Sequence, residues 1–180
     1  GKVLQAYRLA HIYNDHESET YQEALEKLRL GFMVLIREGS AARNLESIVK
    51  GMVEHRLNTE YCGFCTDDKH LEDILEEGHI DYCVRKAISL GMDPIQAIKI
   101  ASWNIARSIR QKDLGAVAPS YKADLLVLSD LESVNIDTVI FSGHIVDDAY
   151  LNCFKKVDPP KDVLNTMVVP DVSEKDISLK

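Results

Sequence analysis

The sequence lacks the long apolar runs and basic clusters that mark membrane and nucleic-acid-binding proteins. No apolar stretch approaches the ~20 residues that a helix needs to span a bilayer. Lysine and arginine number 21 against 29 aspartates and glutamates, so the formal net charge is −8. With no local cluster of lysine or arginine, this charge argues against nucleic acid and anionic membranes as partners. The 180 residues, 46% hydrophobic and 28% charged, predict an ordinary globular chain of one domain or slightly more.

Cysteine is scarce, and its spacing completes neither a zinc ribbon nor a disulfide framework. Cys62 and Cys65 form a C-x-x-C pair, but a ribbon needs a second pair and the third residue after Cys83 is Lys86. No helix start follows Cys62 directly, which makes a redox pair the weaker interpretation. The four cysteines predict reduced, packed thiols in a cytoplasmic protein.

Several common catalytic and nucleotide-binding motifs are absent. The chain has no G-x-G-x-x-G, no P-loop and no G-x-S-x-G, and H-E-x-x-H fails because Thr20 occupies its last position after His16-Glu17. His70-Leu71-Glu72 imitates part of the nucleotide-deaminase signature H-x-E…P-C-x-x-C, but the C-x-x-C of this chain comes earlier. These patterns therefore do not explain the chemistry of the chain.

The first two thirds of the chain alternate strand-like and helix-like segments. Thr20 to Glu23 form a capping box that opens a helix, and Gly31 closes it. Asp93, Pro94 and Gln96 mark a later helix start, with Asp93 as cap and Gln96 completing a box. Strands are predicted over 9–13 and 32–36 and in the run that leads into Thr66, and helices over 41–50 and 71–90 with a break near Gly78.

The pattern changes after Lys112. Strands are predicted over 123–128 and, as a pair around Gly143, over 138–146. We therefore expect an α/β segment over 1–112, a small β unit over 113–157, and a linker or tail over 158–180.

Three predicted strands end in polar triplets: Asp15-His16-Glu17, Arg37-Glu38-Gly39 and Thr66-Asp67-Asp68. The carboxyl ends of parallel strands converge on one face, where such folds carry out their chemistry. Neutral imidazole and carboxylate suit zinc, iron or manganese, and a carboxylate beside a metal-bound water can act as a general base. The triplets therefore predict parts of a metal-dependent active site.

The candidates differ in how well a structural role explains them. Asp68 is better placed than Asp67 to cap the helix from Leu71, which leaves Asp67 for function. His16 is either a turn histidine or a ligand, and the two other polar strand ends favour the ligand.

Glu38 is either functional or paired with Arg37 or Arg43. His70 and His79 are expected to be solvated or capping residues.

The segment Gly115-Ala116-Val117-Ala118-Pro119-Ser120-Tyr121-Lys122-Ala123-Asp124-Leu125 resembles the return strand of the amidohydrolase superfamily, with Ser120 at a usual glycine. Further segments resemble the adenine deaminase family in the order in which they occur: Asn14-Asp15-His16-Glu17-Ser18, Arg37-Glu38-Gly39-Ser40-Ala41, Thr66-Asp67-Asp68 and Glu77-Gly78-His79-Ile80-Asp81. The resemblance covers about residues 1–150.

The resemblance implies a TIM-barrel hydrolase that uses manganese, iron or zinc to convert adenine to hypoxanthine and ammonia in purine salvage. It makes Asp67 a metal ligand and proton shuttle and His16 a metal ligand. It places Glu38, Ser40 and Asp68 on the substrate face. A purine base as substrate, a homo-oligomer and a cytoplasmic location are expected.

The resemblance also implies that this chain is incomplete. The H-x-H of strand one, the bridging acid of strand four and the histidine of strand five have no counterpart. We expect a partial TIM-type (β/α) barrel, its last three βα units, followed by a small β-sandwich segment. The isolated chain is then expected to hold no complete metal site and to be inactive. A non-catalytic interaction module and another amidohydrolase, similar to dihydroorotases or deacetylases, remain as alternatives.

Overall fold

A computed structural model describes residues 1–155, 157–164, 166–167 and 170–178. The chain divides into two units, residues 1–146 and 147–180. The first unit holds a parallel sheet with helices and a small antiparallel sheet. The second holds short helical segments: α8 (Asp148–Leu151), a 3-10 turn (Lys161–Val163) and α9 (Glu174–Ile177).

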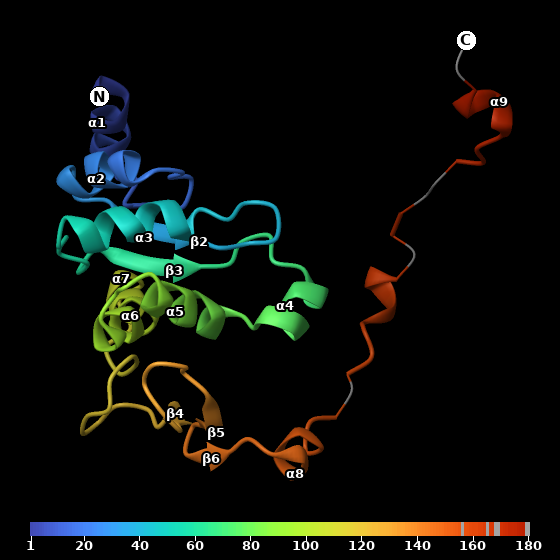
Figure 1. Cartoon of the computed structure of the whole chain (residues 1–180). Helices are drawn as coiled ribbons and strands as arrows, with labels where there is room; N and C mark the ends of the chain where they lie inside the picture. The colour runs from blue at the N-terminus through green and yellow to red at the C-terminus, as the bar shows by residue number, and fades with distance from the viewer. Residues whose placement is uncertain (156, 165, 168–169, 179–180) are drawn as a thin grey trace. The chain divides into compact units, whose positions relative to one another are not determined.

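The parallel sheet positions the candidate site. Its strands are β1 (Asn14–Asp15), β2 (Met33–Arg37) and β3 (Cys62–Cys65), in the order β1-β2-β3. Strand β2 lies in the centre of the sheet and pairs with both β1 and β3. Its continuous apolar run is typical of a strand that is buried on both faces. Figure 1 shows β2 and β3 running toward the same end, where the loops that follow them and α4 lie.

Helices before, between and after the strands make up the rest of this part. Figure 1 shows α2 and α3 beside one another. Helix α3 also packs against α5, and α2, α3, α5 and α6 share one core cluster with β2. The bounds are α1 (Lys2–Leu9), α2 (Tyr21–Arg29), α3 (Leu45–Glu54), α4 (Leu71–Glu77), α5 (Ile80–Ser89), α6 (Pro94–Ala101) and α7 (Trp103–Ser108).

Side chains alternate between the two faces of the sheet. On β2, Val34 and Ile36 are fully buried and belong to the same core cluster as residues of α2, α3, α5 and α6. Leu35 and Met33 lie on the second face, where a side chain at Gly63 would meet both of them. This alternation continues into the polar residues that follow each strand.

The predicted helix signals are largely confirmed. Thr20 and Glu23 form the reciprocal capping box, and Gly31 follows the end of α2 with φ +81°. Gly78, with φ +100°, separates α4 from α5 as expected. Asp93 caps α6 and Pro94 is its first residue, but the side chain of Gln96 donates to Thr59 at 3.1 Å rather than completing a box.

The strand predicted over 9–13 is wrong. Residues 2–9 are helix α1, and His11 at φ +63° lets the amides of His11 and Ile12 bond back to the carbonyls of Arg8 and Tyr7. The apolar residues that suggested a strand therefore belong to the end of α1, which His11 closes in the left-handed conformation. The pairing strand is the shorter β1, which begins at Asn14.

The helix predicted over 41–50 begins later, at Leu45. Residues 38–44 instead fold back on β2, and the backbones of Glu38 and Arg43 form an isolated β-bridge. The amide of Gly39 donates to the carbonyl of Ala42 at 2.9 Å, and the amide of Asn44 donates to the carbonyl of Arg37 at 3.0 Å. The loop after β2 is therefore an ordered turn.

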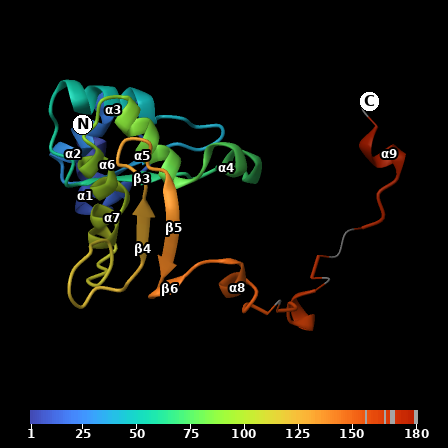
Figure 2. The same cartoon turned by 60° about the horizontal axis from the view of Figure 1, so that its bottom comes forward.

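The antiparallel sheet contains β4 (Leu125–Leu128), β5 (Ile136–Phe141) and β6 (His144–Ile145). Figure 2 shows β4 and β5 side by side. Ser142 and Gly143 turn the chain between β5 and β6 with φ of +48° and +81°, so the strand pair predicted around Gly143 is confirmed.

The boundaries predicted at 112 and 157 stay a prediction. Within the predicted tail 158–180, positions 165, 168–169 and 179–180 lie outside the described residues. None of the helices in the described ranges is long and apolar enough to cross a membrane.

The contact between α3 and α2 leaves no room for a side chain at Gly51. A β-carbon there would overlap the Cβ and ring of Tyr21, which stacks on His55 at 5.0 Å. We expect Gly51→Ala to destabilise the protein by about 1–2 kcal/mol, because overpacking outweighs the gain in helix propensity. Thermal or urea unfolding measures this; Glu54→Ala, exposed in the same helix, is the control. A Gly51→Ala variant as stable as the wild type would contradict this close packing.

Candidate active site at the carboxyl ends of the strands

His16 and Asp67 meet beyond the carboxyl ends of β1 and β3. His16 Nε2 lies 3.7 Å from Asp67 Oδ1 and 3.4 Å from Glu17 Oε1. Both His16 and Asp67 are about two-fifths exposed, so a ligand can reach them. The structure thus brings together the two residues that the sequence assigned to the metal.

Arg37 is a member of this site that the sequence reasoning did not single out. Its guanidinium lies 3.0 Å from Glu17 and 3.4 Å from Asp67, and its side chain is only 11% exposed. Burial works to lower the pKa of Arg37, but the charges and hydrogen bonds of Glu17 and Asp67 outweigh it and raise the pKa. The strand pattern could have indicated this role: Arg37 lies two residues after Leu35 and so on the same face of β2. Asp67 lies on that side of the sheet.

Glu38 is fully buried on the opposite face and pairs with Lys86 of α5. Glu38 Oε1 lies 2.7 Å from Lys86 Nζ, and Oε2 accepts the amide of Leu45 at 3.3 Å. The predicted alternative of a salt bridge with Arg37 or Arg43 is wrong, because Glu38 follows Ile36 on the helix-covered face of the strand. Burial acts to lower the pKa of Lys86, but its bond with Glu38 raises it on balance.

Asp68 does not cap the following helix, contrary to the prediction. Helix α4 has His70 at its N-cap position, with no side-chain cap bond. Asp68 Oδ2 instead accepts the amide of Ala41 at 3.0 Å, in the loop after β2. That hydrogen bond holds the pKa of Asp68 below its usual range.

Ser40 contacts His70, which precedes α4, and Asp73 in the first turn of that helix. Its hydroxyl oxygen accepts the amide of His70 at 2.8 Å and also makes a hydrogen bond to Asp73. Ser40 as a substrate-face residue stays a prediction.

A chain of charges lies beside these loops. Glu77 accepts from Arg43 and from Lys69, both at 2.7 Å, and the hydrogen bond from Lys69 is the main reason why the pKa of Glu77 is lowered. The Lys69 side chain is only 1% exposed and its ammonium lies 4.4 Å from the ring centre of Tyr82. A buried ammonium needs such partners.

His70 and His79 both occupy helix N-cap positions without side-chain cap bonds, and both are exposed. His79 Nε2 lies 3.0 Å from the hydroxyl of Thr66.

The donor set near Asp67 fits part of a metal site. Two ligand atoms bound at about 2.1 Å in a tetrahedral site lie about 3.4 Å apart. The 3.7 Å between His16 Nε2 and Asp67 Oδ1 is close to that separation. Within residues 1–155, 157–164, 166–167 and 170–178, however, no three histidine, cysteine, aspartate or glutamate side chains are grouped to hold a metal. Among the described residues, His16 and Asp67 are thus two donors whose spacing fits part of a metal site.

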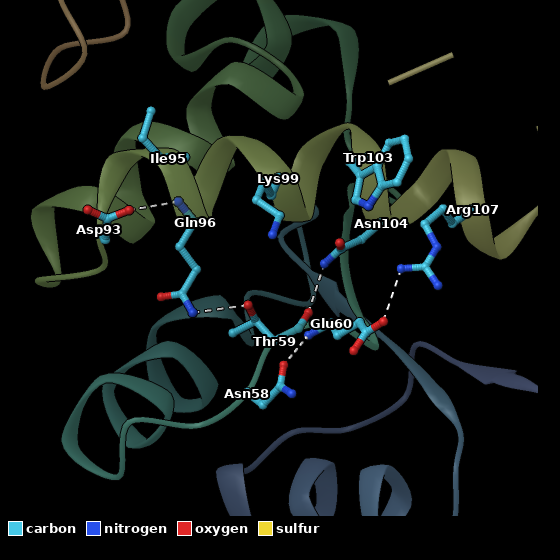
Figure 3. A pocket seen from close by; sticks show the side chains of 10 residues that line it. All are labelled: Asn58, Thr59, Glu60, Asp93, Ile95, Gln96, Lys99, Trp103, Asn104 and Arg107. Atoms are coloured by element: carbon cyan, nitrogen blue, oxygen red, sulfur yellow. Dashed lines mark hydrogen bonds and ion pairs between the residues drawn. The ribbon is translucent and has the colours of Figure 1, made fainter. Parts of the chain in front are cut away.

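A cavity of about 580 Å³ lies at the other end of β3. Thr59 and Glu60, which precede β3, form one wall, and α6 and α7 form the other (Figure 3). Asn104 fixes this wall through hydrogen bonds to the carbonyls of Thr59 and Cys62 at 2.8 and 2.9 Å. Because Asp67 follows the opposite end of β3, this cavity is not part of the candidate site.

All four cysteines are free thiols, as predicted. Burial raises the pKa of Cys62 and Cys83 to about 12 and that of Cys65 to about 11. Cys153 is exposed, so the expected packing does not extend to it. The raised pKa values disfavour the thiolate that redox chemistry needs.

Comparison with known proteins identifies the family. The profile described as "Amidohydrolase family" matches residues 3–146, so the chain belongs to the amidohydrolase family. Together with its structural neighbours, this membership makes the α/β unit part of a TIM-type barrel.

Relatives named adenine deaminase cover nearly the whole chain. The one from Desulfitobacterium hafniense (strain Y51) is 47% identical over 99% of this chain and 31% of its own length. The one from Clostridium acetobutylicum is 44% identical over 100% of this chain and 32% of its own length. The chain therefore spans about a third of the length of these relatives.

A solved structure shares the fold at lower identity. The β-aspartyl dipeptidase of Fervidobacterium islandicum AW-1 matches 77% of this chain and 38% of its own, with a TM-score of 0.56 and 17% identity.

The Glu38–Lys86 pair can be tested by removing its cation. We expect Lys86→Met to destabilise the protein by about 3 kcal/mol, because it leaves the Glu38 carboxylate buried without a counter-charge. Lys50→Met, which breaks an exposed pair with Glu46, should stay within about 0.5 kcal/mol of the wild type. Equal urea midpoints for the two variants would refute the buried pair.

The lowered pKa of Glu77 predicts a pH dependence of stability. Its ion pairs are fully formed above its unfolded pKa of about 4.3 and are lost as the pH falls through the lower pKa of the folded state. Glu77→Gln should therefore cost about 2 kcal/mol at neutral pH. In melts at successive pH values the difference should shrink below about pH 4. Glu76→Gln, exposed on the same helix, is the control; a Glu77→Gln deficit that does not change with pH would contradict this assignment.

Proposed function

We propose that the polypeptide to which this chain belongs is an adenine deaminase, which hydrolyses adenine to hypoxanthine and ammonia. The observation that carries the proposal is the identity of 47% and 44% to two adenine deaminases across nearly all of this chain. The approach of His16 to Asp67 at the carboxyl ends of the strands supports it, because family members of this fold class place their active sites there.

In this proposal His16 and Asp67 are two ligands of a divalent metal, and the remaining ligands come from outside these 180 residues. When bound, a divalent metal (manganese, iron or zinc) would supply an activated water. Asp67 would accept a proton from the attacking water and donate it toward the leaving amine. Arg37 holds the carboxylates of Asp67 and Glu17 in place through its ion pairs.

The substrate face consists of the loops after β2 and β3 in this proposal, with Ser40 on that face. Glu38 is fully buried and paired with Lys86, so in this proposal it holds the loop after β2 and does not contact the substrate. A purine base is a small, planar substrate, and no basic surface for nucleic acid is required.

We further propose that β1 to β3 and their helices are the last three βα units of the barrel, over 1–112, and that residues 113–157 belong to a β-sandwich, followed by a linker. The enzyme would act in the cytoplasm as a homo-oligomer. The 180-residue chain by itself would be inactive.

One feature favours a second candidate function. Within the described residues, β1 and β3 each pair on one side only, and open strand edges can pair with another chain. A non-catalytic interaction module that uses these edges is therefore one alternative. An amidohydrolase acting on a dihydroorotase- or deacetylase-type substrate is a separate alternative.

The proposed function is tested by assaying ammonia and hypoxanthine release from adenine with manganese or iron, using the full polypeptide that the gene encodes. Asp67→Asn should lower kcat by about 10³-fold, because it removes the proton acceptor and a ligand. Asp137→Asn, at an exposed position of β5, should retain wild-type rates.

Other outcomes separate the alternatives. Turnover of dihydroorotate or N-acetyl sugars, and not adenine, would favour the other amidohydrolases. No turnover together with a stable oligomer would favour the interaction module. Robust adenine turnover by the 180-residue chain alone would refute the incomplete-site proposal.

A further inference from the structure

Asp68 joins the loop after β3 to the loop after β2. Its Oδ2 accepts the amide of Ala41 at 3.0 Å. A β-carbon at Gly39 would overlap the Asp68 carboxylate and come within 2.8 Å of the carbonyl oxygen of Thr66. We call this contact of Asp68 with Gly39 and Ala41 the loop latch, and only a glycine at position 39 leaves room for it.

Further hydrogen bonds and an ion pair connect the loop after β2 to the segment that follows β3. Ser40 accepts the amide of His70 at 2.8 Å and contacts Asp73, and Arg43 lies 2.7 Å from Glu77. Both segments are therefore held near β2 and β3 by side chains at several points.

Asp67 stands between two fixed points. The residue two before it, Cys65, is paired with Arg37 in the sheet, and the residue after it forms the loop latch. Asp67 itself has φ +50°, in the left-handed region that most non-glycine residues avoid and that aspartate tolerates. In that conformation it faces His16 and Arg37.

We propose that Asp68 is a positioning residue, which holds Asp67 toward His16 through the loop latch. Its Oδ2 is engaged by Ala41, and its Oδ1 is buried without a hydrogen-bond partner among the described residues. The carboxylate thus lies between the two loops. The proposal rests on the proposed function for its effect on catalysis, although the latch itself can be measured without it.

The experiment compares Asp68→Ala, Asp68→Asn, Gly39→Ala and Asp130→Ala in the full polypeptide that the gene encodes. Asn keeps an oxygen that can accept the Ala41 amide, whereas Ala does not. Asp130 is the matched control, because it also accepts backbone amides, those of Glu132 and Ser133, but in the antiparallel part. The measurements are hydrogen exchange at the Ala41 amide, the NMR signals of the His16 ring, and kcat and KM for adenine.

For Asp68→Ala and Gly39→Ala we expect exchange at Ala41 to accelerate by about 10-fold or more and the His16 ring signals to shift. Both variants should lose about 10-fold in kcat with little change in KM, as expected when orientation and not binding is impaired. Asp68→Asn should stay within about threefold of the wild type in exchange and in kcat. The control Asp130→Ala should match the wild type in both measurements.

Two results would overturn the proposal. One is an Asp68→Ala variant with unchanged Ala41 exchange and His16 signals. The other is an Asp68→Asn variant as inactive as Asp68→Ala, which would make the carboxylate a chemical group. If Asp68→Ala does not fold, Gly39→Ala decides by the same readouts. If the wild type does not deaminate adenine, the proposed function fails, while exchange and His16 signals still decide on the loop latch.

Discussion

A pleated strand directs successive side chains to opposite faces, and this alternation decides what each polar strand end can do. Asp15 pairs in register with the buried Val34 and binds Lys27 at 2.6 Å on the helix-covered face. Glu38 lies on that same face and binds Lys86. Their sequence neighbours His16 and Arg37 reach the other face and meet Asp67 there. In each pair the acid forms an ion pair on the helix-covered face, while its sequence neighbour lies on the opposite face beside Asp67.

The carboxyl ends of the strands are stabilised mainly by paired charges. Glu38, Lys69 and Arg37 are largely buried, and each has a partner of opposite charge. Such pairs add little net stability compared with apolar packing, because desolvation offsets their attraction, but loss of one partner is expensive. Their effect is to fix the loops after β2 and β3 in one arrangement.

Local signals in the sequence predicted most of the elements. The Thr20 capping box, Gly31, Gly78 and the Asp93-Pro94 pair act through neighbouring residues only, and each lies where it was expected. The failures have both local and non-local causes. Residues 9–13 satisfy a strand pattern, yet the amides of His11 and Ile12 bond back to nearby carbonyls of helix α1. Gln96 could have completed a box, but Thr59, distant in sequence, takes its side chain.

The residues alone point to three strands that end in acids or histidine, to Asp67 and His16 as the chemical candidates, and to a resemblance to the amidohydrolases. The partners of each charge follow only from the folded chain. Lys86 lies far along the chain from Glu38, and Ala41 lies far from Asp68. The physical reason is that burial of a charge is resolved by whatever opposite charge or amide the fold brings near, and sequence spacing does not record that approach. The same reason turned Asp68 from a helix cap into the residue that joins two loops beside Asp67.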